Sequence, residues 1–139
     1  MNSLISNGNL HCIVNEVNVY INFGSVIPET IKVIKKSSAN TSIYIGKYCF
    51  IHETVSFVVD SDQDIIIEND VSLSNTILHS GIIIHNGAIV NKEIGDKNYQ
   101  SYTINNKELR YPQEIIDKLL IMKWWDYPMC VINGLVNLK

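Results

Sequence analysis

The side chains of this chain that are best suited to proton transfer are three histidines. His52, His79 and His85 each follow directly after an isoleucine or a leucine. An imidazole with an ordinary pKa near 6.5 accepts a proton at neutral pH and can serve as a general base. The alternative for each of them is a histidine at a surface corner that takes no part in a reaction.

Three acids, Asp60, Asp62 and Asp64, form the other cluster of titratable side chains. A solvated carboxylate has a pKa near 4 and is a weak base at neutral pH. Asp and Ser residues close together are also typical of turns. We therefore expect a turn here, and these acids remain the candidates for a base if no histidine serves.

The elements that must position these side chains follow a six-residue period, which is neither the 3.6 of a helix nor the simple alternation of a strand. One column is apolar: Ile21, Ile27, Val33, Ala39, Ile45, Ile51 and Phe57. A second column, four residues further on, is small or apolar: Ser25, Ile31, Ser37, Ile43, Cys49, Val55 and Ser61. Two inward positions per six residues predict a hexapeptide β-helix rather than a β-sandwich.

The six-residue period slips twice. It resumes with Ile67 and Leu73, and then, one residue early, with Leu78, Ile84 and Val90. The first slip predicts a short excursion from the repeat over residues 58–66. With three hexapeptides in each turn, the inward positions predict about four coils. The same count puts His52, His79 and His85 on three different faces, with their side chains pointing outward.

Four segments follow from these patterns. Residues 1–20 are expected to form an N-terminal capping segment, residues 21–94 the repeat, and residues 95–111 an extended connection. Residues 112–139 hold a helix and tail. The helix is predicted over residues 112–125, because Pro112 suits a first turn and the following apolar residues form one stripe: Ile115, Ile116, Leu119, Leu120 and Trp124. The fold class is thus an all-β solenoid with a C-terminal α-helix.

The composition fits one domain of 139 residues that is 46% hydrophobic and 18% charged. A net charge of −3 provides no basic surface for nucleic acid. No apolar run has the length of a membrane span and the first residues lack a signal-peptide pattern, so we expect a cytoplasmic protein with no membrane partner. Cys12, Cys49 and Cys130 are odd in number and widely spaced, and are expected to be structural.

Three stretches of the repeat and one of the tail carry a resemblance to a known family. Residues 45–51 (IGKYCFI), 67–71 (IENDV) and 87–90 (GAIV) resemble the repeats of left-handed β-helix acyltransferases. Residues 115–128 (IIDKLLIMKWWDYP) are similar to the C-terminal helix of the xenobiotic (streptogramin and chloramphenicol) acetyltransferase branch. Relatives in that branch also acetylate sugars of surface polysaccharides.

The resemblance implies a left-handed parallel β-helix that assembles as a homotrimer and binds acetyl-CoA between neighbouring subunits. It implies an O- or N-acetyltransferase that acts on a sugar or sugar nucleotide, with a histidine as general base and no metal. His79 is the first candidate for that base because it lies in the later coils, where relatives bind acetyl-CoA, and His52 is the second. No residue is assigned to binding the co-substrate.

Two alternatives remain, one from a departure within the resemblance and one from the three histidines. Relatives carry their catalytic histidine on a long loop, whereas the corresponding residues 58–64 of this chain are few and contain no histidine. The chain could therefore be a catalytically degenerate trimeric scaffold. A more remote alternative is a zinc enzyme like the γ-class carbonic anhydrases, which share the architecture and bind zinc through three histidines across a subunit interface.

Overall fold

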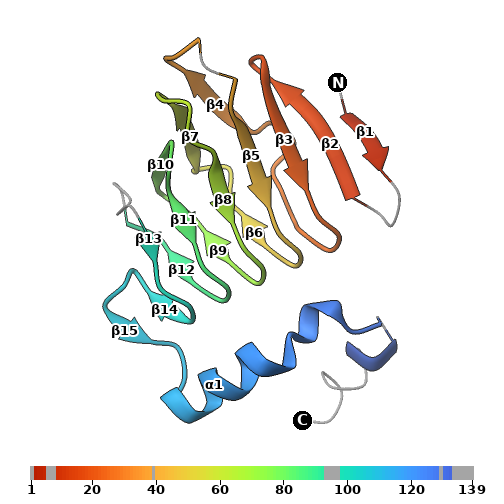
Figure 1. The fold of residues 1–139 in the computed structure, drawn as a ribbon, viewed down its shortest axis with the longest axis vertical. Coiled ribbons are helices and arrows are strands. Elements are labelled where there is room, and N and C mark those ends of the chain that lie inside the picture. Colours follow the sequence, from red (N-terminus) through yellow and green to blue (C-terminus); the bar gives the residue numbers. More distant parts are fainter. Residues whose placement is uncertain (1, 6–8, 39, 93–97, 129, 133–139) are drawn as a thin grey trace.

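The described part of the chain is mostly β, and its strands form three sheets that are followed by an α-helix and a short 3₁₀ helix (Figure 1). The computed structural model describes residues 2–5, 9–38, 40–92, 98–128 and 130–132. We name the sheets A, B and C. Within the described residues, no helix is both long and apolar enough to cross a membrane.

Each sheet has a parallel core built from strands that lie far apart in the sequence. In sheet A the strands are β1 (Asn2–Ile5), β2 (Asn9–Val14), β3 (Val17–Ile21), β5 (Ser42–Ile45), β8 (Ile65–Ile67), β11 (Ile83–Ile84) and β13 (Asn98–Tyr99). In sheet B they are β6 (Phe50–Ile51), β9 (Ser72–Leu73), β12 (Ile89–Val90), β14 (Thr103–Ile104) and β15 (Glu108–Leu109). In sheet C they are β4 (Lys32–Lys35), β7 (Ser56–Val59) and β10 (Ile77–His79).

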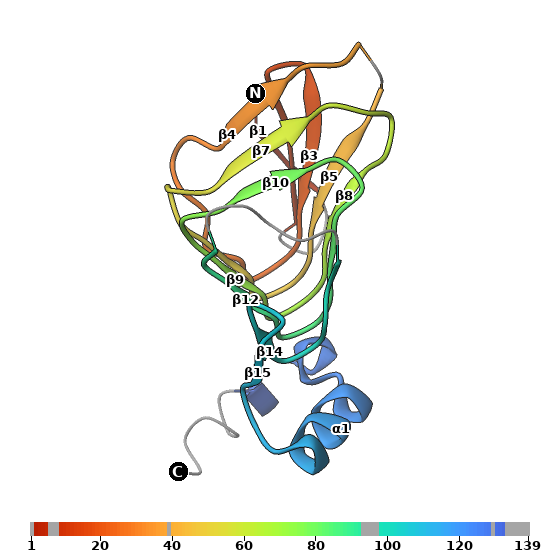
Figure 2. The same ribbon diagram turned by 90° about the vertical axis from the view of Figure 1, so that its left-hand side faces the viewer.

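The chain visits the sheets in rotation, so that the three sheets surround one core (Figure 2). From β3 in sheet A it passes Val26, which bridges to Phe50 of sheet B, and then enters β4 of sheet C. The strands β5, β6 and β7 repeat this order, as do β8, β9 and β10. The pairings β1–β2, β2–β3 and β14–β15 are antiparallel, so sheets A and B are mixed.

Successive circuits of the chain shorten from the N-terminal end to the C-terminal end. In sheet A one inward column stacks in parallel register: Ile21, Ile45, Ile67, Ile84 and Tyr99. These pairings make the four circuits 24, 22, 17 and 15 residues long. The predicted return after three hexapeptides is wrong for the first circuit, which closes at Ile45, six residues later than predicted, because the connection from β4 in sheet C to β5 in sheet A is longer. The second circuit closes at Ile67, as the predicted slip requires, and its connection from sheet C to sheet A, residues 60–64, lies within the predicted excursion.

The predicted inward columns account for most of the core. Buried members include Ile21, Ile31, Val33, Ile43, Ile45, Cys49, Ile51, Val55, Phe57, Ile67, Leu73, Leu78, Ile84 and Val90. Ile27 is partly buried and packs against this core. The serines assigned to the second column, Ser25, Ser37 and Ser61, are only partly buried, and Ala39 lies outside the described residues.

The corner between sheets A and B repeats one backbone conformation in every circuit. Five residues, each three positions after the stacked inward residue, have positive φ: Gly24, Tyr48, Asp70, Gly87 and Tyr102. A Cβ atom on Gly24 or Gly87 would meet the ring of the tyrosine in the next circuit. The left-handed corner and the tyrosine packed over it therefore explain why glycine occupies these two positions.

The C-terminal segment lies outside the corner that joins sheets A and B (Figure 2). Helix α1 (Gln113–Met122) ends at Lys123, whose φ of 47° is left-handed, and a 3₁₀ helix (Trp124–Asp126) follows. The regular helix is thus shorter than the predicted 112–125. Of the predicted apolar stripe, Ile116 is buried, whereas Ile115 is exposed. The Trp124 ring lies against the Tyr48 ring, with centroids 5.1 Å apart.

Candidate functional site

His79 ends strand β10, and its imidazole is hydrogen-bonded to the Asp60 carboxylate of the neighbouring circuit. The Nδ1–Oδ2 distance is 2.8 Å. Parallel pairing of β10 with β7 places His79 opposite Val58, two residues before Asp60. The Ser80 hydroxyl accepts hydrogen bonds from the backbone N–H groups of Asp60 and Ser61, at 3.1 and 3.3 Å. Strand register and Ser80 together hold the carboxylate beside the imidazole.

The contact with Asp60 determines which nitrogen of His79 carries a proton. A carboxylate only accepts hydrogen bonds, so Nδ1 must donate, and in the neutral imidazole Nε2 is then unprotonated. The hydrogen bond from His79 also lowers the pKa of the Asp60 carboxyl, which is therefore ionised at neutral pH. An imidazole oriented in this way has the form that a general base requires.

Both members of the His79–Asp60 pair are accessible to water. Their side chains are 47% and 38% exposed. Solvent screens such a pair, so its contribution to the free energy of unfolding is small, roughly 0–1 kcal/mol. Orientation of the imidazole is the larger consequence of the contact.

His52 is the second candidate from the sequence, and its Nδ1 accepts hydrogen bonds where Nδ1 of His79 donates one. Its Nδ1 accepts a hydrogen bond from the backbone N–H of Thr54 at 3.2 Å. The Thr54 hydroxyl lies 2.7 Å from the same nitrogen and itself accepts from the backbone N–H of Asn75. Because Nδ1 is an acceptor, the neutral imidazole carries its proton on Nε2. The geometry therefore favours a corner-stabilising role for His52 over a general base.

His85 shares the arrangement of His79. Its Nδ1 lies 3.1 Å from Oε1 of Glu68, which also accepts a hydrogen bond from the backbone N–H of Asn86. Both histidines thus pair with a carboxylate of the preceding circuit. Neither carboxylate was assigned as a partner from the sequence, although the 17 residues between Glu68 and His85 equal the length of that circuit.

The hydrogen bonds of His52, His79 and His85 are the structural observations that distinguish a candidate general base from a surface histidine. No family model, curated protein or solved structure matches it. The roles assigned to His79 and Asp60 therefore depend on geometry and on the patterns of the repeat and the tail.

The three histidines belong to three different sheets, as the sequence predicted. His52 follows β6 of sheet B, His79 ends β10 of sheet C, and His85 follows β11 of sheet A. Among the residues that the structure describes, no three His, Cys, Asp or Glu side chains come together as metal ligands would. A zinc site built from these histidines would need contributions from more than one subunit.

Cys49 is part of the core, as the repeat predicts. It is buried, and its Sγ donates a hydrogen bond to the backbone carbonyl of Glu68 at 2.9 Å. Burial raises the pKa of the thiol to about 11. A thiol with so high a pKa carries almost no thiolate at neutral pH, so Cys49 is unsuited to act as a nucleophile.

A second polar cluster lies at the corner between sheets A and B. Asp70 is partly buried there, and its Oδ2 is 3.8 Å from Nη1 of Arg110, which is too far for a hydrogen bond. The same Nη1 donates to the backbone carbonyl of Gly87 at 2.7 Å. Burial raises the pKa of the Asp70 carboxyl to about 6, although Arg110 acts in the opposite direction.

Proposed function

We propose that the three sheets form a left-handed parallel β-helix of the hexapeptide type, an all-β solenoid of about four coils with a C-terminal α-helix. The rotation of the chain through sheets A, B and C supports this architecture. So does the stacking of one inward residue per circuit, from Ile21 to Tyr99.

On this fold, the protein acts as an acetyl-CoA-dependent O- or N-acetyltransferase with His79 as its general base. The observation that carries the proposal is the hydrogen bond from His79 Nδ1 to Asp60, which leaves Nε2 as the basic nitrogen. Asp60 is the positioning residue. The resemblance of the repeat and of the double-tryptophan tail to acetyltransferases of this architecture supplies the reaction class.

The proposed reaction has two proton transfers, both through His79. Nε2 takes the proton of the acceptor hydroxyl or amine while the acceptor oxygen or nitrogen attacks the thioester carbonyl of acetyl-CoA. The tetrahedral intermediate then collapses, the carbon–sulfur bond breaks, and the imidazolium returns its proton to the leaving thiolate. Asp60 stabilises the imidazolium between the two steps because it stays ionised.

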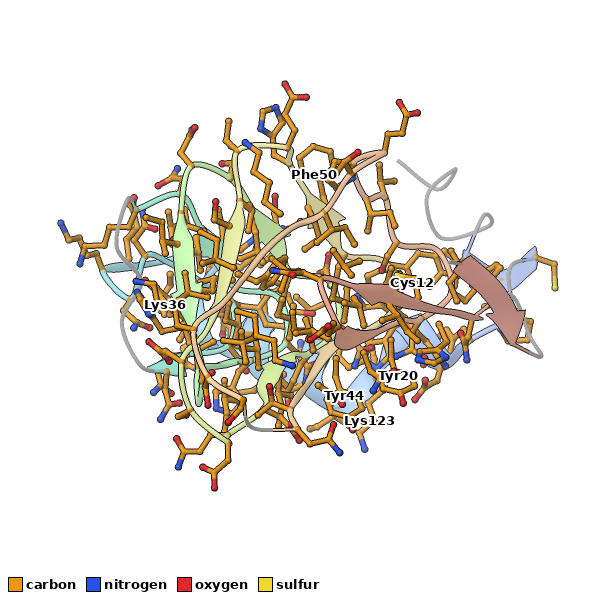
Figure 3. The ribbon with its side chains drawn as sticks, turned by 90° about the horizontal axis from the view of Figure 1, so that it is seen from above. Cys12, Tyr20, Lys36, Tyr44, Phe50 and Lys123 are labelled. Carbon is orange, nitrogen blue, oxygen red and sulfur yellow. The ribbon has the colours of Figure 1, made fainter. Side chains whose placement is uncertain are left out.

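The active form is a homotrimer, in which a neighbouring subunit supplies the second wall of the site. On the outer face of sheet C, Ile77 is 36% accessible and lies two residues before His79, and Ile34 is 47% accessible and lies across Val58 from His79. Sheet A exposes Tyr44 and Ile66 on its own outer face (Tyr44 is labelled in Figure 3). Apolar side chains in these positions favour coverage by another subunit.

The acceptor is a sugar or sugar nucleotide, as for the relatives that the tail resembles. Dependence on acetyl-CoA also places the reaction in the cytoplasm, where this co-substrate is formed. Neither nucleic acid nor a membrane is required as a partner.

A second candidate function is that of a trimeric scaffold without catalysis. The exposure of His79 and Asp60 favours it, because a general base that remains in water has no means of excluding hydrolysis. The two functions differ in one respect that can be measured directly, which is whether the protein binds acetyl-CoA.

Binding is the first test. Acetyl-CoA at about 100 times its dissociation constant should raise the free energy of unfolding by about 2.7 kcal/mol, measured as an increase in Tm. No change of Tm at millimolar acetyl-CoA would refute the acetyltransferase and leave the scaffold.

Catalysis is the second test, followed as release of the CoA thiol in the presence of a panel of sugar nucleotides. We expect His79→Gln to lower kcat/KM by about 10²- to 10⁴-fold and Asp60→Asn by about tenfold or more. His52→Gln is the matched control and should retain full activity. Equal loss in the His52 and His79 variants would show that the assignment of the base is wrong.

A further inference from the structure

A hollow of about 650 Å³ lies between the C-terminal 3₁₀ helix and the corner that joins sheets A and B. Its walls include Phe23 and Tyr48 from the first two circuits and Trp125 and Tyr127 from the C-terminal segment. The volume falls within the range of about 300–1,000 Å³ that is typical of small-molecule sites. None of these residues comes from sheet C, which carries His79.

The aromatic walls support one another and are formed before any ligand arrives. The Phe23 ring meets the Tyr48 ring edge-on at 5.8 Å. Tyr48 lies 5.1 Å from the Trp124 ring, which in turn is 5.9 Å from the Trp125 ring. Trp125 is 5% exposed. Rings held in this way present fixed apolar surfaces at little entropic cost.

The polar groups of the hollow are one cation, one anion and an amide. Lys47 Nζ and Asp126 Oδ1 are 2.9 Å apart and join the second circuit to the 3₁₀ helix. The Asn9 side chain also lines the hollow, and its Oδ1 accepts a hydrogen bond from the backbone N–H of Phe23 at 2.9 Å. Because the charges of Lys47 and Asp126 cancel, an ionic ligand of either sign would meet one like charge.

We propose that this hollow is a binding site for a neutral saccharide. The C–H face of a sugar ring packs against aromatic side chains, and its hydroxyls both donate and accept hydrogen bonds. Asp126 accepts, Lys47 donates and Asn9 can do both, so the polar groups match a ligand with neutral hydroxyls. The site is independent of the proposed acetyl transfer, and its occupation requires neither His79 nor acetyl-CoA.

Intrinsic fluorescence reports on this site, because the two tryptophans of the chain are Trp124 and Trp125. Maltose, cellobiose and N,N′-diacetylchitobiose are titrated separately into the full chain, with choline as a cationic probe that would suit an aromatic cage. We expect a saturable fluorescence change with at least one disaccharide and none with choline.

Variants locate the binding. Asp126→Ala and Tyr127→Ala should each weaken it by about tenfold, as expected for loss of a hydrogen bond to a charged group or of an aromatic wall. Asp117→Ala, an exposed change on helix α1, is the matched control and should bind as the parent does. Thermal melts verify that all three variants remain folded.

Three results would overturn the proposal. They are the lack of a saturable change with every disaccharide, unchanged affinity in both Asp126→Ala and Tyr127→Ala, and a response to choline without one to the disaccharides. Retained binding in His79→Gln would support the independence of this site from acetyl transfer.

Discussion

Replacement of Asp70 by asparagine should remove a pH dependence from the stability of this protein. The carboxyl is partly buried at the corner between sheets A and B, and burial raises its pKa to about 6 from 3.8. Arg110 is near but does not donate a hydrogen bond to it. Asparagine has the same shape, cannot ionise, and tolerates the positive φ of 58° at this position.

The expected magnitude follows from the shift of the pKa. Between pH 4 and 6 the folded state binds more protons than the unfolded state, so the free energy of unfolding falls as the pH rises through this window. The rise of the Asp70 pKa from 3.8 to about 6 corresponds to roughly 3 kcal/mol of unfolding free energy, and the parent has lost all of it once the pH is above the folded pKa. We therefore expect Asp70→Asn to become more stable relative to the parent by up to about 3 kcal/mol as the pH rises from 4 to 7.

Urea unfolding of the parent and the variant at half-unit steps from pH 4 to 8 measures this difference. All other ionisable groups are common to the parent and the variant, so their contribution cancels in the comparison. Asp62→Asn makes the same chemical change at an exposed site and should give a curve parallel to that of the parent.

Two outcomes would contradict the reasoning. A difference between Asp70→Asn and the parent that stays constant with pH would mean that the carboxyl is solvated and titrates normally. A difference that changes in the opposite direction would mean that attraction to Arg110 outweighs burial.

Two further predictions concern the core and the corners. Ile51→Asp places a charge among stacked aliphatic side chains and should lower the free energy of unfolding by about 3–5 kcal/mol. Phe50→Asp, on the exposed side of the same strand, is the control and should lower it by about 1 kcal/mol or less. Equal losses in urea unfolding would show that the inward column is misplaced. Gly81→Ala should lower the free energy of unfolding by about 1–2 kcal/mol because φ is positive there, while its Cβ would meet only the flexible Gln63 side chain. Gly87→Ala should cost at least about 1 kcal/mol more, because φ is also positive and its Cβ would meet the buried Tyr102 ring. Similar Tm values for the two glycine variants would show that Tyr102 moves aside.

The sequence predicted the burial pattern because burial at each step of a repeat is a local property. Ile45, Ile51 and Leu73 are buried where the six-residue period placed them. The outward histidines follow from the same period. Side-chain alternation along a strand needs no knowledge of which strands pair.

The two slips in the period correctly give the lengths of the second and third circuits, but the length of the first circuit could not be predicted in the same way. Ala39 fits the apolar column and Ser37 fits the column that accepts small residues, so the pattern predicts that both belong to the repeat. In the structure Ser37 lies in the connection from sheet C to sheet A, which begins at Lys36, whose backbone N–H donates a hydrogen bond to the carbonyl of Val59. Small residues suit both an inward slot and a turn, and the sequence alone does not separate the two.

The six-residue period also could not predict contacts between segments that are far apart in the sequence. Lys47 and Asp126 are 79 residues apart and meet because the C-terminal segment runs along the corner of sheets A and B. No period relates these two positions. The aromatic character of the tail was visible in the sequence, but the hollow beside it was not.

The His79–Asp60 pair arises from the difference in length between neighbouring circuits. Between sheets C and A the chain uses residues 60–64 in the second circuit and only 80–82 in the third. The longer second connection stands over the shorter third one, to which it is joined by the hydrogen bond from Gly81 N–H to the Asp64 carbonyl. Asp60 can therefore turn from the end of β7 toward His79 at the end of β10. Continued strand register would place Asp60 opposite Gly81, two residues beyond His79, so this pair does not come from direct stacking as the Glu68–His85 pair does. The irregularity that obscured the repeat in the sequence is thus what creates its candidate catalytic pair.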